Sequence, residues 1–411
     1  MALAPPERLS LNLSPEALAA ELAHLPGFVV LDSASSSSRT TPDGSDYGPI
    51  SLISALPTSV IRGHLSHPEA LRDLLAEDRD EAYPDWGVPV GGAIGMVDFN
   101  GDYLFGQYPH LLIYHHDRDE WMQTGASTLL DRRRPGQNAS SSRPTISFRS
   151  GMSREGFVER VEKALEWIAA GDIYQVNLSQ QFSAPSQGED PFQTYLSLRD
   201  ASPSPYGAYL NLGGRVVLSS SPECFLRMSG RGILTRPIKG TRPRFPGNRL
   251  QDERSAYDLI TSPKEVAELV MITDLERNDL GQLCQYGSVH VKELLKLERF
   301  EQVFHLVSTV EGTLRDEWDH VEALVRCSPG GSISGAPKKR ALEIIEALEP
   351  VPRGLYTGSI GYLGSNEESQ MSIAIRTLVL EEGHWHFHVG AGIVADSNPE
   401  FEYEETLHKA R

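Results

Sequence analysis

Ser372-Ile-Ala-Ile-Arg-Thr-Leu-Val-Leu380 and Trp385-His-Phe-His-Val389 are two strand-like runs separated by four residues that include Gly383. A further run, Ser359-Ile-Gly-Tyr362, comes shortly before them. Strands joined by such short turns pair antiparallel, because a parallel pair needs a crossover of a dozen or more residues. This part of the chain therefore predicts antiparallel sheet.

The rest of the chain mixes strands and helices without a regular alternation. Residues 1–150 contain short apolar runs and are expected to form a sheet-rich N-terminal region. Residues 151–411 are expected to form a second domain, with helices from Ser153, Ser262 and Ala336 and a polar helix from Pro399. We predict an α+β fold with large antiparallel sheets and helices on the outside.

Composition narrows the classes of function. The chain has 411 residues and a formal net charge of −18, which disfavours nucleic acid and anionic membranes as partners. Its three cysteines, Cys224, Cys284 and Cys327, have neither zinc-site nor disulfide spacing. We find no leader pattern and no run of roughly 20 apolar residues. We expect a protein of the reducing cytoplasm, with no nucleic-acid or membrane partner.

Two pairs of acidic residues are candidates for a metal site. Glu265 and Glu268 are three residues apart on the helix that begins at Ser262, and Glu402 and Glu405 repeat that spacing on the last helix. Four converging carboxylates would repel one another unless a cation lay among them, and Mg²⁺ prefers such oxygen ligands. The alternative is that both pairs are solvated helix faces.

Three further segments are candidates for chemistry. The glycine-rich loop 330–338 leads into an expected helix; it can present free N–H groups to an anion, or it can be a flexible turn. Lys239 lies in a run of three cations; in a desolvated pocket it can act as a nucleophile, and otherwise it belongs to a basic surface loop. Glu223 ends an apolar strand and can act as a general acid if burial raises its pKa; more often such a residue is exposed.

Six motifs occur in a fixed order between about residue 150 and the C-terminus: Gly171-Asp-Ile-Tyr-Gln-Val-Asn177, Ser220-Ser-Pro-Glu223, Pro237-Ile-Lys-Gly-Thr-Arg-Pro243, Asp274-Leu-Glu-Arg-Asn-Asp-Leu-Gly281, Gly331-Ser-Ile-Ser-Gly-Ala-Pro-Lys338 and Gly390-Ala-Gly-Ile393. In this order they resemble the chorismate-utilising enzymes, which include anthranilate, aminodeoxychorismate, isochorismate and salicylate synthases. The resemblance implies their fold and a chorismate-binding catalytic domain at 151–411. Residues 1–150 resemble the N-terminal region of anthranilate synthase component I more weakly.

The resemblance implies a role for each acidic pair and for a set of substrate contacts. Mg²⁺ would be held by Glu268 and Glu405, with Glu265 and Glu402 acting mainly through water, and would meet the ring carboxylate of chorismate. His305 matches a histidine near the reacting ring. The implied substrate contacts are Ser332, Tyr356, Arg376, Gly390, Gly392, Lys409, Thr241 and Gln175.

Two positions distinguish the branches of the family. Isochorismate and salicylate synthases carry a water-activating lysine at the position of Gln175, and glutamine cannot act as that base. At the position of Lys239, anthranilate synthases usually have alanine, whereas aminodeoxychorismate synthases have lysine. The resemblance therefore implies that Lys239 attacks C2 of chorismate while Glu223 protonates the departing C4 hydroxyl. Ammonia then adds at C4 and expels the lysine, giving 4-amino-4-deoxychorismate on the route to p-aminobenzoate and folate.

The implied partners follow from this reaction. None of the cysteines lies in the turn that carries a glutaminase nucleophile, so we expect a separate glutaminase subunit to supply ammonia and a separate aminodeoxychorismate lyase to act downstream. Asp32 and Ser33, with Pro205 and Tyr206, match a tryptophan pocket of the aminating members. Three alternatives stay open: an anthranilate synthase component I with lysine at 239, a non-catalytic chorismate- or tryptophan-binding regulatory subunit, and an isochorismate or salicylate synthase, which Gln175 opposes.

Overall fold

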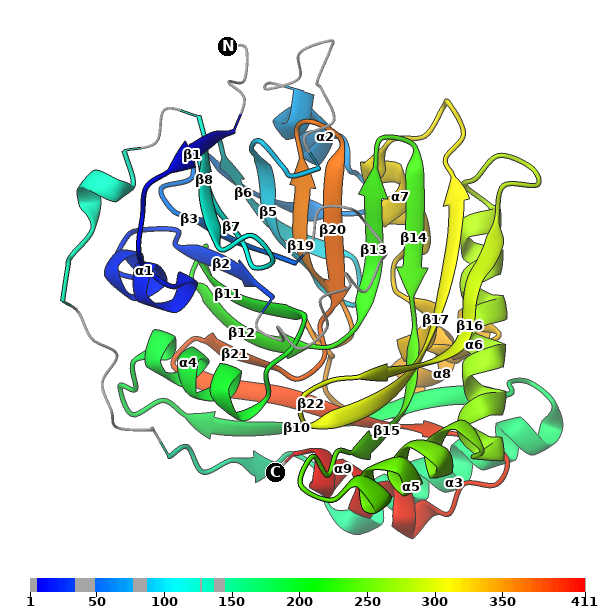
Figure 1. The fold of residues 1–411 in the computed structure, drawn as a ribbon. Helices are drawn as coiled ribbons and strands as arrows, with labels where there is room; N and C mark the ends of the chain where they lie inside the picture. The colour runs from blue at the N-terminus through cyan, green and yellow to red at the C-terminus, as the bar shows by residue number, and fades with distance from the viewer. Residues whose placement is uncertain (1–5, 34–48, 77–86, 126–127, 137–144, 411) are drawn as a thin grey trace.

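The computed structural model describes residues 6–33, 49–76, 87–125, 128–136 and 145–410. These residues form two large sheets that face each other, with helices on their outer sides (Figure 1). Neighbouring strands pair antiparallel in both sheets. The predicted α+β fold with large antiparallel sheets is confirmed.

The larger sheet has twelve strands among the described residues. They run in the order β1 (Glu7–Leu9), β8 (Glu120–Thr124), β7 (Leu111–His115), β3 (Ile50–Ser54), β2 (Val29–Asp32), β11 (Tyr206–Leu212), β12 (Arg215–Ser221), β21 (Thr377–Glu381), β22 (His384–Ile393), β10 (Gln175–Pro185) and β18 (Gly335–Ala336), with β9 (Arg149–Ser150) paired to β10. The expected strand 372–380 is divided: residues 372–373 end β20 (Glu368–Ile373) of the smaller sheet, and only 377–380 belong to β21. Strand β21 pairs antiparallel with β22, which contains the run 385–389, as expected.

The smaller sheet has ten strands in the same part of the chain. They run in the order β15 (Ile238–Pro243), β17 (Val303–Thr313), β14 (Gly232–Arg236), β13 (Cys224–Ser229), β20 (Glu368–Ile373), β19 (Ser359–Gly364), β5 (Gly92–Val97), β6 (Asp102–Tyr108) and β4 (Val60–His64), with β16 (His290–Arg299) paired to β17. Both sheets take strands from either side of residue 150, so the predicted boundary there does not separate two sheets.

The outer layers consist of nine helices in the described residues. They are α1 (Pro15–Leu22), α2 (Glu69–Ala76), α3 (Arg154–Ala170), α4 (Pro191–Ala201), α5 (Arg249–Ile260), α6 (Pro263–Gly281), α7 (His320–Cys327), α8 (Lys338–Leu348) and α9 (Pro399–Lys409), with short 3₁₀ turns at Leu130–Arg132 and Gly331–Ile333. One apolar core lies between the sheets and joins Val29 and Leu210 of the larger to Ile94 and Tyr362 of the smaller. Helices α3 and α8 cover β10 and β22.

The sequence signals for two helices act as expected. The Ser153 hydroxyl accepts the N–H of Gly156 at the start of α3, and Gly171 ends that helix in the left-handed conformation with φ 82°. The Ser262 hydroxyl accepts the N–H of Glu265, which fixes the first turn of α6. These caps orient the helix that carries one predicted acidic pair.

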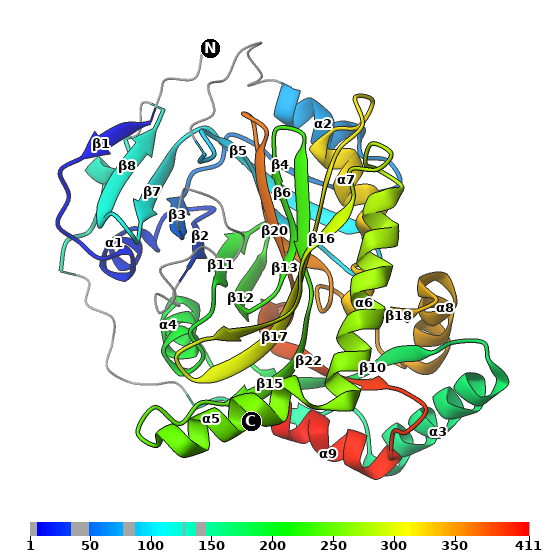
Figure 2. The same ribbon diagram turned by 45° about the vertical axis from the view of Figure 1, so that its right-hand side comes forward.

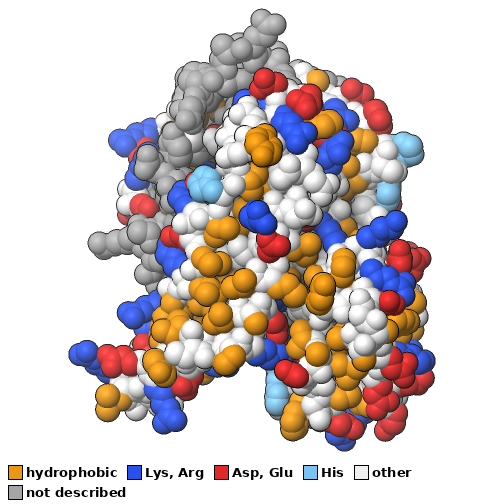
Figure 3. All heavy atoms as spheres, turned by 90° about the vertical axis from the view of Figure 1, so that its right-hand side faces the viewer, with side chains coloured by type: hydrophobic (Ala, Val, Ile, Leu, Met, Phe, Trp, Pro, Cys, Tyr) orange, Lys and Arg blue, Asp and Glu red, His pale blue; other side chains and the backbone are white. Residues whose placement is uncertain are grey.

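Helix α6 runs along one side of the molecule, and α5, α9 and α3 follow one another along the bottom (Figure 2). Seen from the side of α6, the surface mixes apolar and polar side chains and is hollowed at its lower edge (Figure 3). Val270 of α6 and Val291 and Leu294 of β16 are exposed apolar residues of these elements. None of the described helices combines the length and hydrophobicity that crossing a membrane requires.

Candidate active site

Lys239 lies on β15, next to a local irregularity in the sheet. Its backbone faces Leu306 on β17, and the register shifts between Lys239 and Thr241. Gly240 between them has φ 77°, and a Cβ there would lie 3.0 Å from Glu265 Oε2 and 2.6 Å from Leu259 Cδ1. Glycine at this position therefore permits both the left-handed backbone and the close approach of α6.

The Lys239 side chain points into the protein and not into bulk solvent. It is half-buried, and its Nζ donates to the carbonyl oxygen of Ser332 at 3.1 Å. Glu223 lies nearby and is buried, with its carboxyl hydrogen-bonded to the Ser332 side chain. Burial raises the pKa of Glu223, although Ser332 and Lys239 oppose the shift. A carboxylic acid that keeps its proton beside an amine is the pairing that the predicted acid and nucleophile require.

The four predicted metal ligands lie on two neighbouring helices, Glu265 and Glu268 on α6 and Glu402 and Glu405 on α9. Glu265 and Glu405 are each close enough to Glu268 to raise its pKa, after burial as the largest cause, and Glu405 does the same to Glu402. Burial opposes ionisation of Glu405, but Lys409 at 2.6 Å together with Lys264 and Lys239 outweighs it and lowers the pKa. The carboxylates of the two pairs therefore lie close enough for their charges to interact across α6 and α9.

The acidic cluster has unused acceptor capacity. Glu268 Oε1 and Glu402 Oε2 are buried without a hydrogen-bond partner, which is costly for a carboxylate. Oxygen atoms of this kind fit a hard cation such as Mg²⁺. Among the described residues, however, no three carboxylate, imidazole or thiol groups converge as a ready metal site. Lys264 lies instead between the pairs, 3.9 Å from both Glu268 and Glu402.

Two glycines on β22 leave space beside polar side chains. A Cβ on Gly390 would lie 2.7 Å from the Tyr356 hydroxyl, and one on Gly392 would lie 2.6 Å from Gln175 Nε2 and 4.0 Å from Glu268 Oε2. Gln175 is buried, and its Oε1 has no hydrogen-bond partner. The two glycines therefore lie close to Tyr356, Gln175 and Glu268.

Arg376 lies near His305 and forms no ion pair with a carboxylate of the described residues. Part of its surface is exposed to solvent, yet burial of the guanidinium lowers its pKa. Its backbone has φ 50°, a strained conformation for arginine that costs on the order of 1–3 kcal/mol. A guanidinium held in this way suits a carboxylate, which it can bind through two parallel hydrogen bonds.

His305 lies between Arg376 and the Lys239 strand. Its Nδ1 is 3.1 Å from the Thr241 hydroxyl, and it hydrogen-bonds the backbone of Gly240. Burial and the nearby Arg376 lower the pKa of His305 to about 4, so the ring is neutral at neutral pH. Lys409, the last predicted contact, donates to the carbonyl oxygen of Gly390 at 3.0 Å. These contacts place His305 beside Thr241 and Gly240, and Lys409 beside Gly390.

Of the two alternatives for loop 330–338, the one with free N–H groups for a bound anion does not hold for its first turn. The N–H groups of Gly331 and Ser332 both donate to Glu276 Oε1, at 3.1 and 3.2 Å. The group that these two N–H groups bind is the Glu276 carboxylate of the protein itself. Sequence reasoning had assigned no role to Glu276, although its position on the buried face of α6, three residues after Thr273 and three before Asp279, was an available signal.

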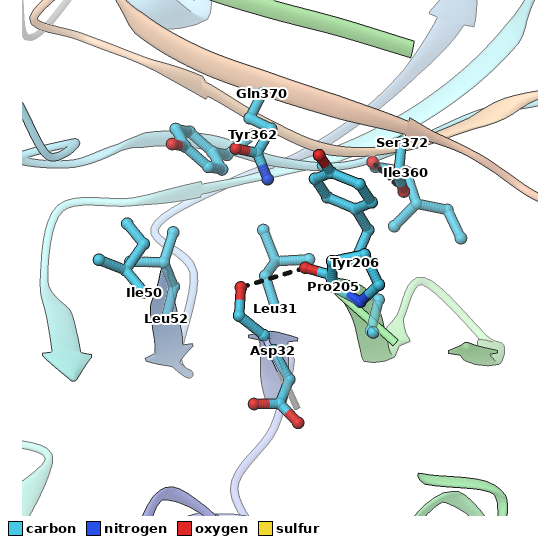
Figure 4. Close-up of a pocket in the computed structure, with 14 residues that line it drawn as sticks. Leu31, Asp32, Ile50, Leu52, Pro205, Tyr206, Ile360, Tyr362, Gln370 and Ser372 are labelled. Atoms are coloured by element: carbon cyan, nitrogen blue, oxygen red, sulfur yellow. Dashed lines mark hydrogen bonds between the residues drawn. The ribbon is translucent and has the colours of Figure 1, made fainter. Parts of the chain in front are cut away.

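A second pocket, between the two sheets, has the residues predicted for tryptophan on its wall. Asp32, Ser33, Pro205 and Tyr206 line it together with apolar side chains and Gln370 (Figure 4). Its empty volume is about 370 Å³, open mouth included. The Ser33 hydroxyl donates to the carbonyl oxygen of Pro205 at 3.1 Å.

The Asp32 carboxylate points away from the other labelled side chains of this pocket (Figure 4). It is bound by Arg199 Nε at 2.5 Å and by the Ser51 hydroxyl at 2.6 Å. The Asp32 carboxylate therefore binds residues outside the pocket, and Arg199 balances its charge.

Known proteins share both the sequence and the fold. Anthranilate synthase component 1 of Thermus thermophilus is 49% identical over 277 residues, covering 67% of this chain and 59% of that protein. Aminodeoxychorismate synthase component 1 of Bacillus subtilis is 47% identical over 264 residues, covering 64% and 56%. The crystal structure of anthranilate synthase component I from Streptococcus pneumoniae has a TM-score of 0.79 at 28% identity, covering 91% of this chain and 94% of that one.

The matched part is less than two thirds of these relatives' own length. Relatives with either name are similarly close to this chain, so overall similarity does not choose between the two reactions. The model of the chorismate binding enzyme family, in contrast, matches residues 91–411, which is well over half of the chain. The protein belongs to the chorismate binding enzymes.

Proposed function

We propose that the protein is an aminodeoxychorismate synthase subunit, which converts chorismate and ammonia to 4-amino-4-deoxychorismate and water. The observation that carries the proposal is the position of Lys239. Its amine donates to the Ser332 carbonyl oxygen, acts to lower the pKa of the buried Glu223, and lies close enough to Glu268 and Glu405 to act on their pKa values in the same direction. A lysine pointing into bulk solvent could not take the role proposed for it.

Each candidate residue has a separate role in the proposed reaction. Arg376 and Tyr356 bind and orient the carboxylates of the substrate. The neutral amine of Lys239 forms a bond to C2, the ring electrons shift, and the C4 hydroxyl leaves as water with the proton of Glu223. Ammonia then bonds to C4, the electrons shift back, and the C2–N bond to Lys239 breaks. Burial favours the protonated form of Glu223 that the first step needs.

Mg²⁺ is part of this proposal. Glu268, Glu402, Glu405 and Glu265 would hold it after Lys264 has moved aside, and the unpartnered oxygens of Glu268 and Glu402 support this assignment. When bound, the ion would neutralise the ring carboxylate of chorismate. We also propose a separate glutaminase subunit as the ammonia source, a downstream lyase, tryptophan as an occupant of the second pocket, and a cytoplasmic location.

Intact-mass analysis tests the central step. The protein and its Lys239→Ala variant are incubated with chorismate and Mg²⁺ in the absence of ammonia. We expect a covalent adduct on the wild type alone, and added ammonia should discharge it. Lys239→Arg serves as a charged control that should also remain unlabelled. Labelling of the alanine variant would eliminate Lys239 as the nucleophile.

Anthranilate synthase is the second candidate, because a relative of that name is 49% identical. The two reactions differ in product: anthranilate is fluorescent and has lost pyruvate, whereas aminodeoxychorismate retains it. Incubation with chorismate, Mg²⁺ and ammonia, without a lyase, should release no anthranilate and no pyruvate. Appearance of both would favour the second candidate.

A further inference from the structure

Glu276 is a buried carboxylate that the proposed reaction does not use. It lies on α6 with 3% of its surface exposed, and its Oε1 accepts the N–H groups of both Gly331 and Ser332. Its Oε2 is 3.5 Å from the Thr235 hydroxyl. A Cβ on Gly331 would lie 3.0 Å from Glu276 Oε1, so the turn fits closely around this carboxylate.

The turn at Gly331 and Ser332, which Glu276 binds, also contacts the proposed nucleophile Lys239 and the proposed acid Glu223. The Ser332 carbonyl accepts from Lys239 Nζ at 3.1 Å, and the Ser332 side chain hydrogen-bonds the Glu223 carboxyl. The next carbonyl, of Ile333, accepts from Asn177 at 3.0 Å and is thereby tied to the strand of Gln175. A shift of this turn would move the amine and the acid together.

We propose that Glu276 is a positioning residue, whose charged carboxylate fixes the Gly331–Ser332 turn and through Ser332 sets both Lys239 and Glu223. This inference rests on the proposed function for the roles of those two groups. Glu276 does not contact the substrate in this proposal and affects the chemical step only through the N–H groups of Gly331 and Ser332.

The charges around Glu276 give the proposal a second consequence. Asp279 of the same helix, Lys338 of α8 and Glu223 face it, and Cys327 of α7 lies near. Burial, Asp279 and Glu223 raise the pKa of Glu276 to about 7, against Lys338 and the Ser332 N–H. Two nearby carboxyls oppose each other's ionisation. Lowering the pH through about 7 therefore protonates Glu276 and removes the negative charge that accepts the two backbone N–H groups.

Glu276→Gln keeps the shape and one acceptor oxygen but removes the charge, and Glu276→Asp keeps the charge but withdraws the carboxylate by one methylene. We expect kcat with chorismate, Mg²⁺ and ammonia to fall about 10–100-fold in both variants. KM for chorismate should change by less than about 2-fold, because Glu276 does not reach the substrate. Asp274→Asn, an exposed position on the same helix, is the matched control and should behave as wild type.

The pH profile separates this role from a merely structural one. If the charged carboxylate fixes the turn, kcat of the wild type should rise as the pH increases through about 7, where Glu276 loses its proton. This limb should be absent in Glu276→Gln and retained in Glu276→Asp. A retained limb or a wild-type kcat in the glutamine variant would overturn the inference. If Lys239→Ala were fully active, the proposed function would fail instead, and the two failures are thus distinguishable.

Discussion

Lys264 Nζ on α6 lies 3.9 Å from Oε1 of Glu402 on α9, and this contact joins the two helices that carry the predicted metal ligands. The same ammonium is 3.9 Å from Glu268 Oε1. The Lys264 ammonium thus lies where Mg²⁺ is proposed to bind, and we expect the ammonium and the ion to compete for the same carboxylates.

Replacing Lys264 by glutamine should make the protein more dependent on Mg²⁺. Without the ammonium the four carboxylates repel one another, so Tm in the presence of a chelator should fall. Mg²⁺ binds only the folded site and should restore it. We expect a larger Mg²⁺-induced rise in Tm for the variant than for the wild type, measured by scanning calorimetry. Equal increments would show that Lys264 and the ion do not share a site.

Glu223→Gln should abolish proton donation while preserving the fold. Glutamine has the size of the protonated acid that burial favours at this position, so Tm should change little. General acid catalysis typically contributes about 10²–10⁴-fold, and kcat should fall by that factor with KM nearly unchanged. A variant with more than a tenth of wild-type kcat would assign the proton to another group.

Arg376→Gln should weaken substrate binding without destabilising the protein. The guanidinium pairs with no carboxylate among the described residues, and its burial disfavours its charge, which glutamine lacks. Hydrogen bonds to a charged group contribute about 1.5–3 kcal/mol, so KM for chorismate should rise roughly 10–150-fold. Tm should stay the same or rise. A fall in Tm with KM unchanged would mean that Arg376 serves the fold.

His388 should make the stability of the protein sensitive to acid. Burial lowers its pKa to about 3, with His386 and Arg353 adding to the shift, and its Nε2 has no partner. The unfolded chain therefore binds a proton between about pH 6.5 and 3 that the folded protein does not, so stability falls as the pH drops through this range.

His388→Phe keeps a ring to stack on Tyr356, which His388 contacts at a centroid distance of 5.4 Å. Its free energy of unfolding should depend less on pH, by about one proton or 1.4 kcal/mol per pH unit, in urea titrations between pH 4 and 6. His305 remains in the variant and retains its own contribution. Identical slopes for the two proteins would refute the assignment.

The fold can be predicted from the sequence more completely than the electrostatics of the candidate site. Short turns such as 381–384 reveal antiparallel pairing, and caps such as Ser153 and Ser262 locate helix starts, because these signals are local. The order of strands is not local: β2 pairs with β11 across more than 170 residues of chain. Motifs identified Lys239 and Glu223, but only coordinates bring Glu276 to the Gly331 N–H group and Lys264 to Glu402, since those contacts depend on how helices pack.

The distribution of the sheets over the whole chain has a consequence for truncation. Strand β2 is the neighbour of β11, and β5 is the neighbour of β19. A fragment that starts at residue 145 would lose both neighbours and present two long rows of unpaired backbone groups, at which further copies can add strands. The strands before residue 125 thus cover edges of both sheets in the part of the chain that carries the candidate catalytic residues. We expect the shortened protein to aggregate, although it still contains every candidate catalytic side chain.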